Sequence, residues 1–196
     1  MDHTVRIAVV GASGSGKTTL ATHLEAIYQN AGLSTVLISQ DDFYLPVGQP
    51  SSNYDKPEAL DLQLLADTLE RLYNNEVVEI PIYDFVTHRR TAKTRLVSPA
   101  DVTIVEGLFL ISDQRLVDRF EKSIYLDIDQ EICFQRRFDR DQNERGREPD
   151  DIIRQYNEQV RPGFENYIAP SQIHATHTLQ GNDLPSEEWA LSLINK

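Results

Sequence analysis

Residues 11–18 read GASGSGKT and match the pattern G-x-x-x-x-G-K-[ST] in full. The glycines of this stretch allow a tight loop whose N–H groups point at phosphate oxygens, and the helix that follows adds its positive end. Lys17 supplies a cation for the β- and γ-phosphates, and Thr18 is placed to ligate Mg²⁺. A buried strand before the motif and a helical pattern after it argue against an ordinary glycine-rich turn. The expected nucleotide-binding residues are Gly11, Ala12, Ser13, Gly14, Ser15, Gly16, Lys17, Thr18 and Thr19.

Acidic residues stand at the ends of two further apolar runs. Asp41 and Asp42 occur in SQDDFY, directly after the run at 35–39, and Glu106 closes VTIVEG. Two adjacent carboxylates at the mouth of a buried strand are costly unless something uses them. Glu106 is the candidate for a second Mg²⁺-linked acid, acting directly or through water, and the alternative is a surface acid after a strand.

The elements that must position these residues follow from hydrophobic periodicity. Helical spacing is expected at 57–73, with a further helix capped by Asp129, and Pro162 and Gly163 are expected to kink or break a helix at 150–168. Runs at 77–83 and 94–97 flank a charged turn, THRRTAK, and predict a β-hairpin flap at about 76–98. The other expected elements are strands at 5–10, 35–39, 102–105, 124–128 and 175–179, helices at 17–30 and from 186, and a loop at 45–53. This order predicts an α/β fold of the P-loop NTPase type: a doubly wound, mostly parallel sheet with helices on both faces.

The bulk properties exclude several classes of protein. The 196 residues suit a single domain, 1–196, and the net charge of −12 argues against nucleic-acid and anionic-membrane partners. Cys133 is the single cysteine, so we expect no intrachain disulfide and an apolar packing role for it. No run approaches the ~20 apolar residues of a membrane span, and the N-terminus does not read as a signal peptide. We expect a cytoplasmic protein.

The phosphate motif identifies a nucleotide rather than a reaction. The chain lacks the D-x-x-G and N-K-x-D segments of a GTPase switch and the L-S-G-G-Q-like signature of a transporter ATPase. Small-molecule kinases are therefore the leading class.

Six motifs occur in order: GASGSGKTT, SQDDFY, NYDKPEALD, PIYDFVTHRR, VEG and RRFDRDQNERGR. With them the chain resembles the uridine kinase (uridine–cytidine kinase) family of P-loop kinases over roughly residues 5–170. The resemblance implies Mg²⁺- and ATP-dependent transfer to the 5′-hydroxyl of uridine, and of cytidine also, by a homo-oligomer, often a tetramer. The resemblance makes Asp41 both the catalytic base and a metal ligand. The place of Asp41 after a strand agrees with this role, because ligands bind at the carboxyl ends of the strands in such sheets. Asp42 is expected to have a supporting role, such as capping the loop. The alternative for Asp41 is that it only caps a helix or turn.

The resemblance also implies a nucleoside site. Asp55 matches the acid that holds the ribose hydroxyls, although it could instead cap a helix at Pro57, and Lys56 stands where the family often has His. Tyr83 and Phe85, two apart on a strand, can enclose a pyrimidine, or they can be ordinary packing residues. The remaining substrate-binding candidates are His88, Tyr44 and Gln155. By resemblance His88 reads the base edge, whereas taken alone it would be a solvated turn residue.

Five arginines fall in a predicted lid at about 136–150, and Arg145 and Arg147 flank Gly146. Guanidinium forks suit the charge of a phosphoryl-transfer transition state. By resemblance, Arg140 and Arg145 are catalytic, Arg147 binds the nucleotide, and Arg137 and Arg140 reach the acceptor. Acids interleave the arginines at Asp139, Asp141 and Glu144, so a salt-bridged helix face in solvent is the alternative.

Other functions stay open. A kinase of the same fold could act on a sugar phosphate or a vitamin-like alcohol, although a phosphosugar would need cations where Tyr83 and Phe85 stand. A catalytically silent, nucleotide-binding regulatory protein is the other alternative. After Pro170 the stretch HATHTLQGND lacks the Pro and Arg of the family pattern, which leaves the donor nucleotide open.

Overall fold

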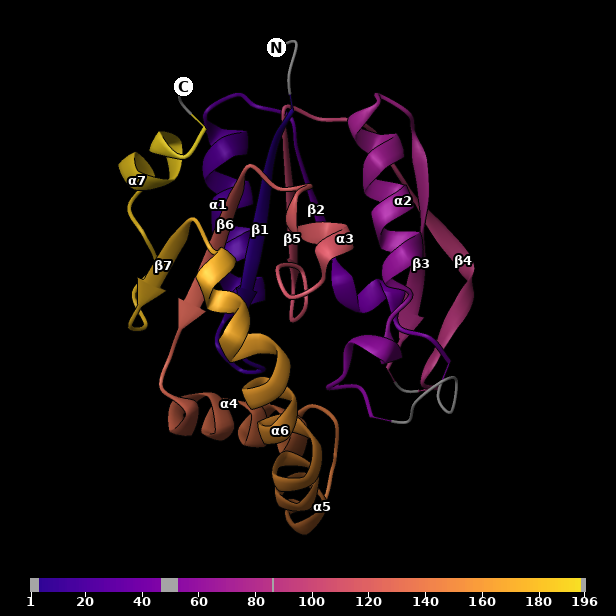
Figure 1. Ribbon diagram of the computed structural model, residues 1–196, viewed down its shortest axis with the longest axis vertical. Helices are drawn as coiled ribbons and strands as arrows, with labels where there is room; N and C mark the ends of the chain where they lie inside the picture. The colour runs from indigo at the N-terminus through magenta and orange to yellow at the C-terminus, as the bar shows by residue number, and fades with distance from the viewer. Residues whose placement is uncertain (1–3, 47–52, 86, 195–196) are drawn as a thin grey trace.

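The computed structural model describes residues 4–46, 53–85 and 87–194, and a five-stranded parallel sheet lies at its centre (Figure 1). The strand order is β2-β5-β1-β6-β7, and every neighbouring pair is parallel. The bounds are β1 Val5–Gly11, β2 Thr35–Ser39, β5 Val102–Gly107, β6 Lys122–Asp127 and β7 His177–Gln180. The parallel α/β sheet predicted from the apolar runs is thereby confirmed.

Helices cover both faces of this sheet because successive strand residues point to opposite sides. In β1, Ile7 and Val9 pack in the core beneath α1 (Lys17–Asn30) and α7 (Glu187–Ser192). Ala8 and Val10 pack on the other side, in the core that includes α2 (Leu62–Tyr73) and α3 (Gln114–Val117). All six residues of β5 are buried, as expected for a strand covered on both faces.

The predicted hairpin is present, but its turn is displaced. β3 (Val78–Asp84) pairs antiparallel with β4 (Arg89–Val97), so most of the THRRTAK stretch is strand rather than turn. The turn lies between the strands, where His88 adopts a positive φ of 53° and the Thr87 hydroxyl donates to Asp84 at 2.7 Å. Arg89 and Arg90 continue the ladder opposite Asp84 and Tyr83, which explains why the charged segment stays extended.

The helix expected from residue 57 begins later. Pro57–Ala59 form a separate 3₁₀ turn, and α2 starts after Asp61, whose carboxylate accepts a hydrogen bond from the Leu64 N–H at 3.0 Å. Asp61 therefore caps the helix, and the alternative role of Asp55 as its cap is wrong. Part of the predicted loop at 45–53, residues 47–52, lies outside the described residues.

The C-terminal helical region holds a second correction. α4 (Gln130–Asn143) begins at its predicted cap, and a helical run then follows through α5 (Pro149–Gln155) and α6 (Arg161–Gly163) to residue 168. Pro162 does not break this run. Two π-helical stretches, Tyr156–Val160 and Phe164–Ile168, lie on either side of Pro162. Their wider turns let the helical run continue although proline has no N–H to donate to the preceding turn.

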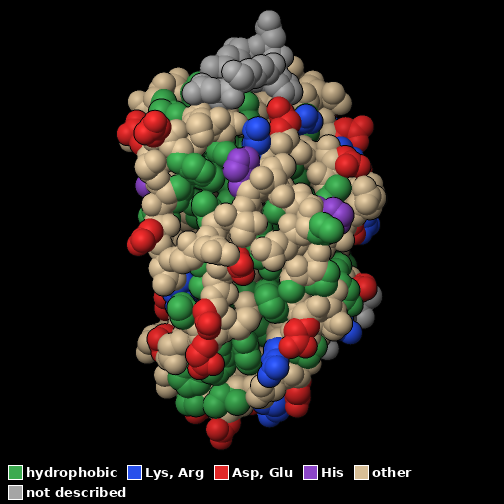
Figure 2. Space-filling view, turned by 60° about the vertical axis from the view of Figure 1, so that its left-hand side comes forward, with side chains coloured by type: hydrophobic (Ala, Val, Ile, Leu, Met, Phe, Trp, Pro, Cys, Tyr) green, Lys and Arg blue, Asp and Glu red, His purple; other side chains and the backbone are tan. Residues whose placement is uncertain are grey.

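One face of the molecule shows how acidic side chains are distributed on the surface. On the face that holds α7, β7 and α4, Asp and Glu side chains are scattered and few Lys or Arg side chains are visible (Figure 2). In the part of the chain that the structure describes, every helix is too short or too polar to cross a membrane.

Candidate active site

The phosphate loop connects β1 to α1 and has the geometry that its sequence predicts. Gly14 and Gly16 adopt φ values of 85° and 95°, which glycine reaches without strain. A Cβ on Gly14 would collide with the backbone carbonyl of Cys133, so α4 packs directly against the loop. Lys17 is buried, and its Nζ donates to the Ala12 carbonyl at 2.8 Å. The cation is thus held at the loop.

Two acids face this lysine. Glu106 is 6% exposed, and it accepts a 2.6 Å hydrogen bond from the Ser39 hydroxyl. Burial, with repulsion from Glu106 as the second cause, raises the pKa of Asp41 to about 6, whereas Lys17 opposes that rise. Burial lowers the pKa of Lys17, and Glu106 and Asp41 oppose the change. The three groups therefore interact at the carboxyl ends of β2 and β5.

These residues fit a magnesium ion. Mg²⁺ prefers oxygen ligands and keeps several waters, and Thr18 is an exposed residue at the start of α1. A divalent cation would relieve the repulsion between Asp41 and Glu106. Within the described ranges no group of three or more His, Cys, Asp or Glu side chains forms a metal cage. A Mg²⁺ ion here would therefore take its other ligands from phosphate and water.

The two neighbouring acids of SQDDFY have different surroundings. Asp42 accepts a hydrogen bond from the backbone N–H of Tyr83, and this bond ties the acid turn to the hairpin. Gln40, which the sequence did not single out, is fully buried and accepts from the Phe109 N–H at 2.9 Å. Asp42 and Gln40 thus anchor the segment, whereas Asp41 remains beside Lys17.

Five rings gather where the hairpin meets the segment after η1 (Gln40–Phe43). Tyr44 lies edge-on to Tyr54 with ring centroids 5.2 Å apart, and Tyr83 lies 5.1 Å from Phe85. Tyr54 stacks on His88 at 5.6 Å and accepts a 3.2 Å hydrogen bond from the Tyr83 hydroxyl. Sequence reasoning missed Tyr54, although its place in the NYDKP motif was a signal. Phe85 and His88 are exposed, so this aromatic cluster has an open side.

Asp55 is 4% exposed, and its Oδ2 has no hydrogen-bond partner among the described residues. Burial raises the pKa of Asp55, and Arg137, whose Nη1 lies 3.8 Å from Oδ1, opposes the rise. Buried polar atoms normally have partners. A ligand hydroxyl could therefore supply the bond that this oxygen lacks.

Four of the five lid arginines converge on Asp141, which is fully buried. Arg140 Nη2 lies 3.0 Å and Arg145 Nη1 3.2 Å from Oδ1. Arg147 Nη1 lies 3.4 Å and Arg137 Nε 3.7 Å from Oδ2. The alternative of a salt-bridged face in solvent is wrong for Asp141, because its carboxylate is fully buried, although Arg140, Arg145 and Arg147 stay partly exposed.

This arginine cluster (Arg137, Arg140, Arg145 and Arg147) contacts both the phosphate loop and the hairpin. Arg137 donates to the Ser13 hydroxyl at 2.7 Å and to Gln155 Oε1 at 3.3 Å. The guanidinium of Arg145 lies 5.3 Å from the centre of the Phe85 ring. The predicted lid residues are therefore brought together with Gln155 between the two binding regions.

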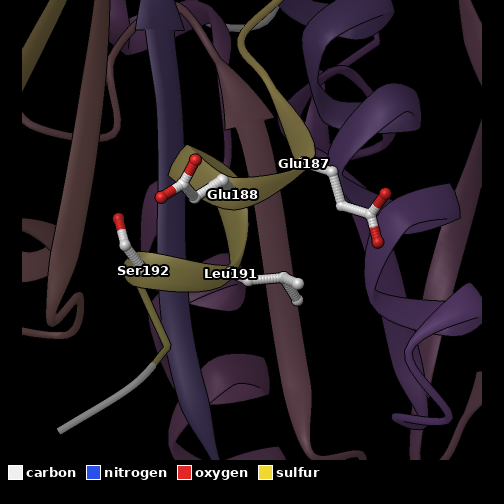
Figure 3. Close-up of a pocket in the computed structure, with 4 residues that line it drawn as sticks. All are labelled: Glu187, Glu188, Leu191 and Ser192. Carbon is white, nitrogen blue, oxygen red and sulfur yellow. The ribbon is translucent and has the colours of Figure 1, made fainter.

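Arg136 points elsewhere. Its Nη2 donates to Asn182 Oδ1 at 2.8 Å, so α4 contacts the divergent stretch after β7. A surface hollow on α7, lined by Glu187, Glu188, Leu191 and Ser192, contains no predicted site residue (Figure 3). It lies beside the C-terminal part of α1, far from the phosphate loop (Figure 1).

A phosphate loop, a buried lysine, two strand-end acids and an arginine cluster on this parallel sheet define a P-loop kinase. The model of the Phosphoribulokinase / Uridine kinase family matches residues 6–182, and the chain belongs to this family.

Curated relatives and solved structures agree with this membership. The chain is 41% identical over 175 residues to a protein of Halalkalibacterium halodurans named uridine kinase, with 86% of this chain and 82% of the relative covered. It is 39% identical over 179 residues to the uridine kinase of Shewanella sp. W3-18-1, with 87% and 84% covered. Phosphoribulokinase from Rhodobacter spheroides shares the fold, with a TM-score of 0.68, 15% identity and coverage of 92% and 71%. D-glycerate 3-kinase from Cryptococcus neoformans also shares the fold, with a TM-score of 0.68, 19% identity, and coverage of 85% of this chain and 80% of that protein.

Proposed function

We propose that this chain transfers the γ-phosphate of ATP to the 5′-hydroxyl of uridine, and also of cytidine, in a Mg²⁺-dependent reaction. The observation that carries the proposal is the interaction of Asp41, Glu106 and Lys17 beside the phosphate loop, next to the aromatic cluster. Relatives named uridine kinase over most of the chain support it.

In this reaction the phosphate loop and Lys17 hold the β- and γ-phosphates. Asp41 accepts the proton of the 5′-hydroxyl as that oxygen attacks, and its raised pKa makes it a stronger base than an ordinary carboxylate. Arg140 and Arg145 stabilise the charge that spreads over the transferred group. When bound through Thr18, Glu106 and Asp41, Mg²⁺ would neutralise phosphate charge.

The nucleoside lies against the hairpin in this proposal. The exposed ring of Phe85 contacts a face of the pyrimidine, with Tyr83 and Tyr44 packed behind it, and His88 meets the edge of the base. The unpartnered Oδ2 of Asp55 accepts from the ribose hydroxyls, which favours ribose over deoxyribose. Arg137 and Gln155 lie near the 5′ end of the acceptor, and Arg147 binds the nucleotide.

The test is ADP release from ATP with uridine, cytidine, deoxyuridine and a series of sugar phosphates as acceptors. We expect turnover with uridine and cytidine and a higher KM for deoxyuridine. Turnover with a sugar phosphate and none with either ribonucleoside would reject the proposal in favour of a phosphosugar kinase. ATP binding without turnover on any acceptor would indicate a regulatory protein, and the same assay with GTP tests the donor.

The organisation of the protein is part of the proposal. The chain forms one domain, 1–196, with a flap at about 76–98 and a lid at about 136–150. The homo-oligomer, a tetramer by family resemblance, and the cytoplasmic location stay predictions. Sedimentation equilibrium and cell fractionation measure them.

A further inference from the structure

Asp141 has surroundings that the proposed reaction does not by itself require. Its side chain has no exposed surface, and ion pairs approach both of its oxygens. Arg140 also donates from Nε to Oδ1 at 3.1 Å, so two of its nitrogens contact one oxygen. The backbone takes part as well, since the Arg147 N–H donates to the Asp141 carbonyl at 3.1 Å. A buried charge of this kind is tolerated only when its partners are well arranged.

The cluster carries more positive than negative charge. Four guanidinium groups surround the Asp141 carboxylate, and Asp55 contacts one of them, Arg137, at 3.8 Å. The whole chain has a net charge of −12, so this surplus is local. Burial, followed by the neighbouring charge of Arg140, lowers the pKa of Arg145, as crowded cations do. Without Asp141 the four groups would repel one another and separate.

The surplus faces the place where phosphate binds. Arg137 hydrogen-bonds Ser13 inside the phosphate loop, and Arg145 extends toward the hairpin at Phe85. Gly146, between Arg145 and Arg147, has a φ of 62°, and a Cβ built on it meets no atom within 4 Å. Asp141 holds both flanking arginines by ion pairs, and each has one further contact, Arg145 with the Phe85 ring and Arg147 with Gln155 Oε1.

We propose that Asp141 is a positioning residue for phosphoryl transfer. Its carboxylate gathers Arg140, Arg145 and Arg147 beside the phosphate loop before ATP binds, so that the transferred phosphoryl group meets guanidinium groups already in place. Preorganised charges stabilise a transition state without reorganising during the reaction, and this is where their catalytic effect arises. The inference rests on the proposed kinase reaction but not on the identity of the acceptor.

A purely structural role makes a different prediction. If Asp141 only fastens the end of α4 to the following loop, its loss would lower stability and leave the kcat of the folded protein unchanged. The positioning role instead predicts a lower kcat with a nearly unchanged KM for ATP. ATP itself supplies negative charge to the cluster, and the competing carboxylate is gone, so binding is retained while the geometry of the arginines is lost.

The variant is Asp141→Asn, which keeps the shape and removes the charge. Its matched control is Asp139→Asn, an exposed residue of the same helix that accepts from Gln135 at 2.8 Å. We expect Asp141→Asn to lower kcat about 10- to 100-fold and to change the KM for ATP less than about 3-fold. Asp139→Asn should match the wild type. A wild-type kcat in folded Asp141→Asn would overturn the proposal.

A second measurement needs no acceptor. Inorganic phosphate should raise the melting temperature of Asp141→Asn more than that of the wild type, because the anion replaces the missing carboxylate. Equal shifts would also overturn the proposal, whereas failure of uridine as acceptor would reject only the substrate.

If Asp141→Asn does not fold, Asp141→Glu keeps the charge, and its kcat should stay within about 10-fold of the wild type. A larger loss at full stability would show that the carboxylate charge is not what positions the arginines.

Discussion

The Ser39 hydroxyl donates a 2.6 Å hydrogen bond to Glu106 and joins the carboxyl ends of β2 and β5. These two residues are also paired in the register of the sheet. The same hydroxyl accepts from the backbone N–H of Asp41 at 3.3 Å, where it caps the turn that follows β2. One serine thus places the two acids of the candidate site relative to each other.

Asp41 and Asp42 are predicted to differ in function although they are adjacent. We expect Asp41→Asn to lower kcat about 10²- to 10⁴-fold, the usual effect of removing a general base, while ATP binding is retained. Asp42→Asn should lower kcat less than about 10-fold, because its carboxylate serves the hydrogen bond from Tyr83. Steady-state kinetics and an ATP titration measure both. Equal losses in the two variants would show that the base is wrongly assigned.

The raised pKa of Asp41 predicts a pH dependence. Since burial and Glu106 raise the pKa of this carboxyl to about 6, its protonated form, which cannot accept the 5′-hydroxyl proton, persists up to that pH. Mg²⁺ bound at Asp41 and Glu106 would relieve their repulsion, so the value of kcat/KM for uridine, at saturating Mg²⁺ and ATP, should fall on acidification only below about pH 6. Asp42→Asn should keep this acidic limb. An acidic limb that persisted unchanged in Asp41→Asn would contradict the role of Asp41.

The elements around the phosphate loop were predictable because their signals are local. A continuous apolar run such as β5 is typical of a strand that is buried on both faces of a parallel sheet. The GASGSGKT motif is typical of one loop conformation, the phosphate loop between a strand and a helix. Lys17 and Glu106 were thus found from sequence together with the strands that carry them. Gln40 was not, because its burial depends on its contact with Phe109, 69 residues away.

The residues that sequence reasoning misjudged owe their roles to how the chain is buried. Asp141 lies among acids and arginines that alternate as on a surface helix, but its carboxylate is fully buried, and arginines of the same segment approach both of its oxygens. Pro162 suggested a helix break, but π-helical turns on both sides of it continue the run, and the adjacent Gly163 packs against the backbone of Asp55. The burial of Asp141 and the contact of Gly163 have no signature in the local pattern.

Arg90 is predicted to couple the hairpin to the catalytic turn. It donates to the carbonyls of Phe43 at 2.8 Å and Tyr44 at 3.0 Å, and its fork lies 3.4 Å from Asp61 Oδ2. Lysine cannot reproduce this fork. We expect Arg90→Lys to raise the KM for uridine about 3- to 10-fold, with a smaller change for ATP, and to lower the unfolding free energy by about 1–2 kcal/mol.

The exposed neighbour of Arg90, Arg89, supplies the control for this measurement. Arg89→Lys should leave both KM values and the denaturation midpoint near the wild type. Kinetics with each substrate varied in turn, together with urea unfolding, separate the two variants. If Arg90→Lys changed the two KM values equally, the hairpin would not be the element that Arg90 positions.

Gly163 is predicted to be required for the position of Asp55. Alanine is the better helix former by about 1 kcal/mol, so propensity alone predicts that Gly163→Ala stabilises the helical run. A Cβ at this position, however, would collide with the Asp55 carbonyl, which belongs to the backbone and cannot rotate away. We therefore expect Gly163→Ala to lower the unfolding free energy by about 1–3 kcal/mol and to raise the KM for uridine more than that for ATP.

Glu158→Ala, at an exposed position of the same run, should change neither KM. A more stable Gly163→Ala protein with an unchanged KM for uridine would mean that Asp55 is positioned by other contacts.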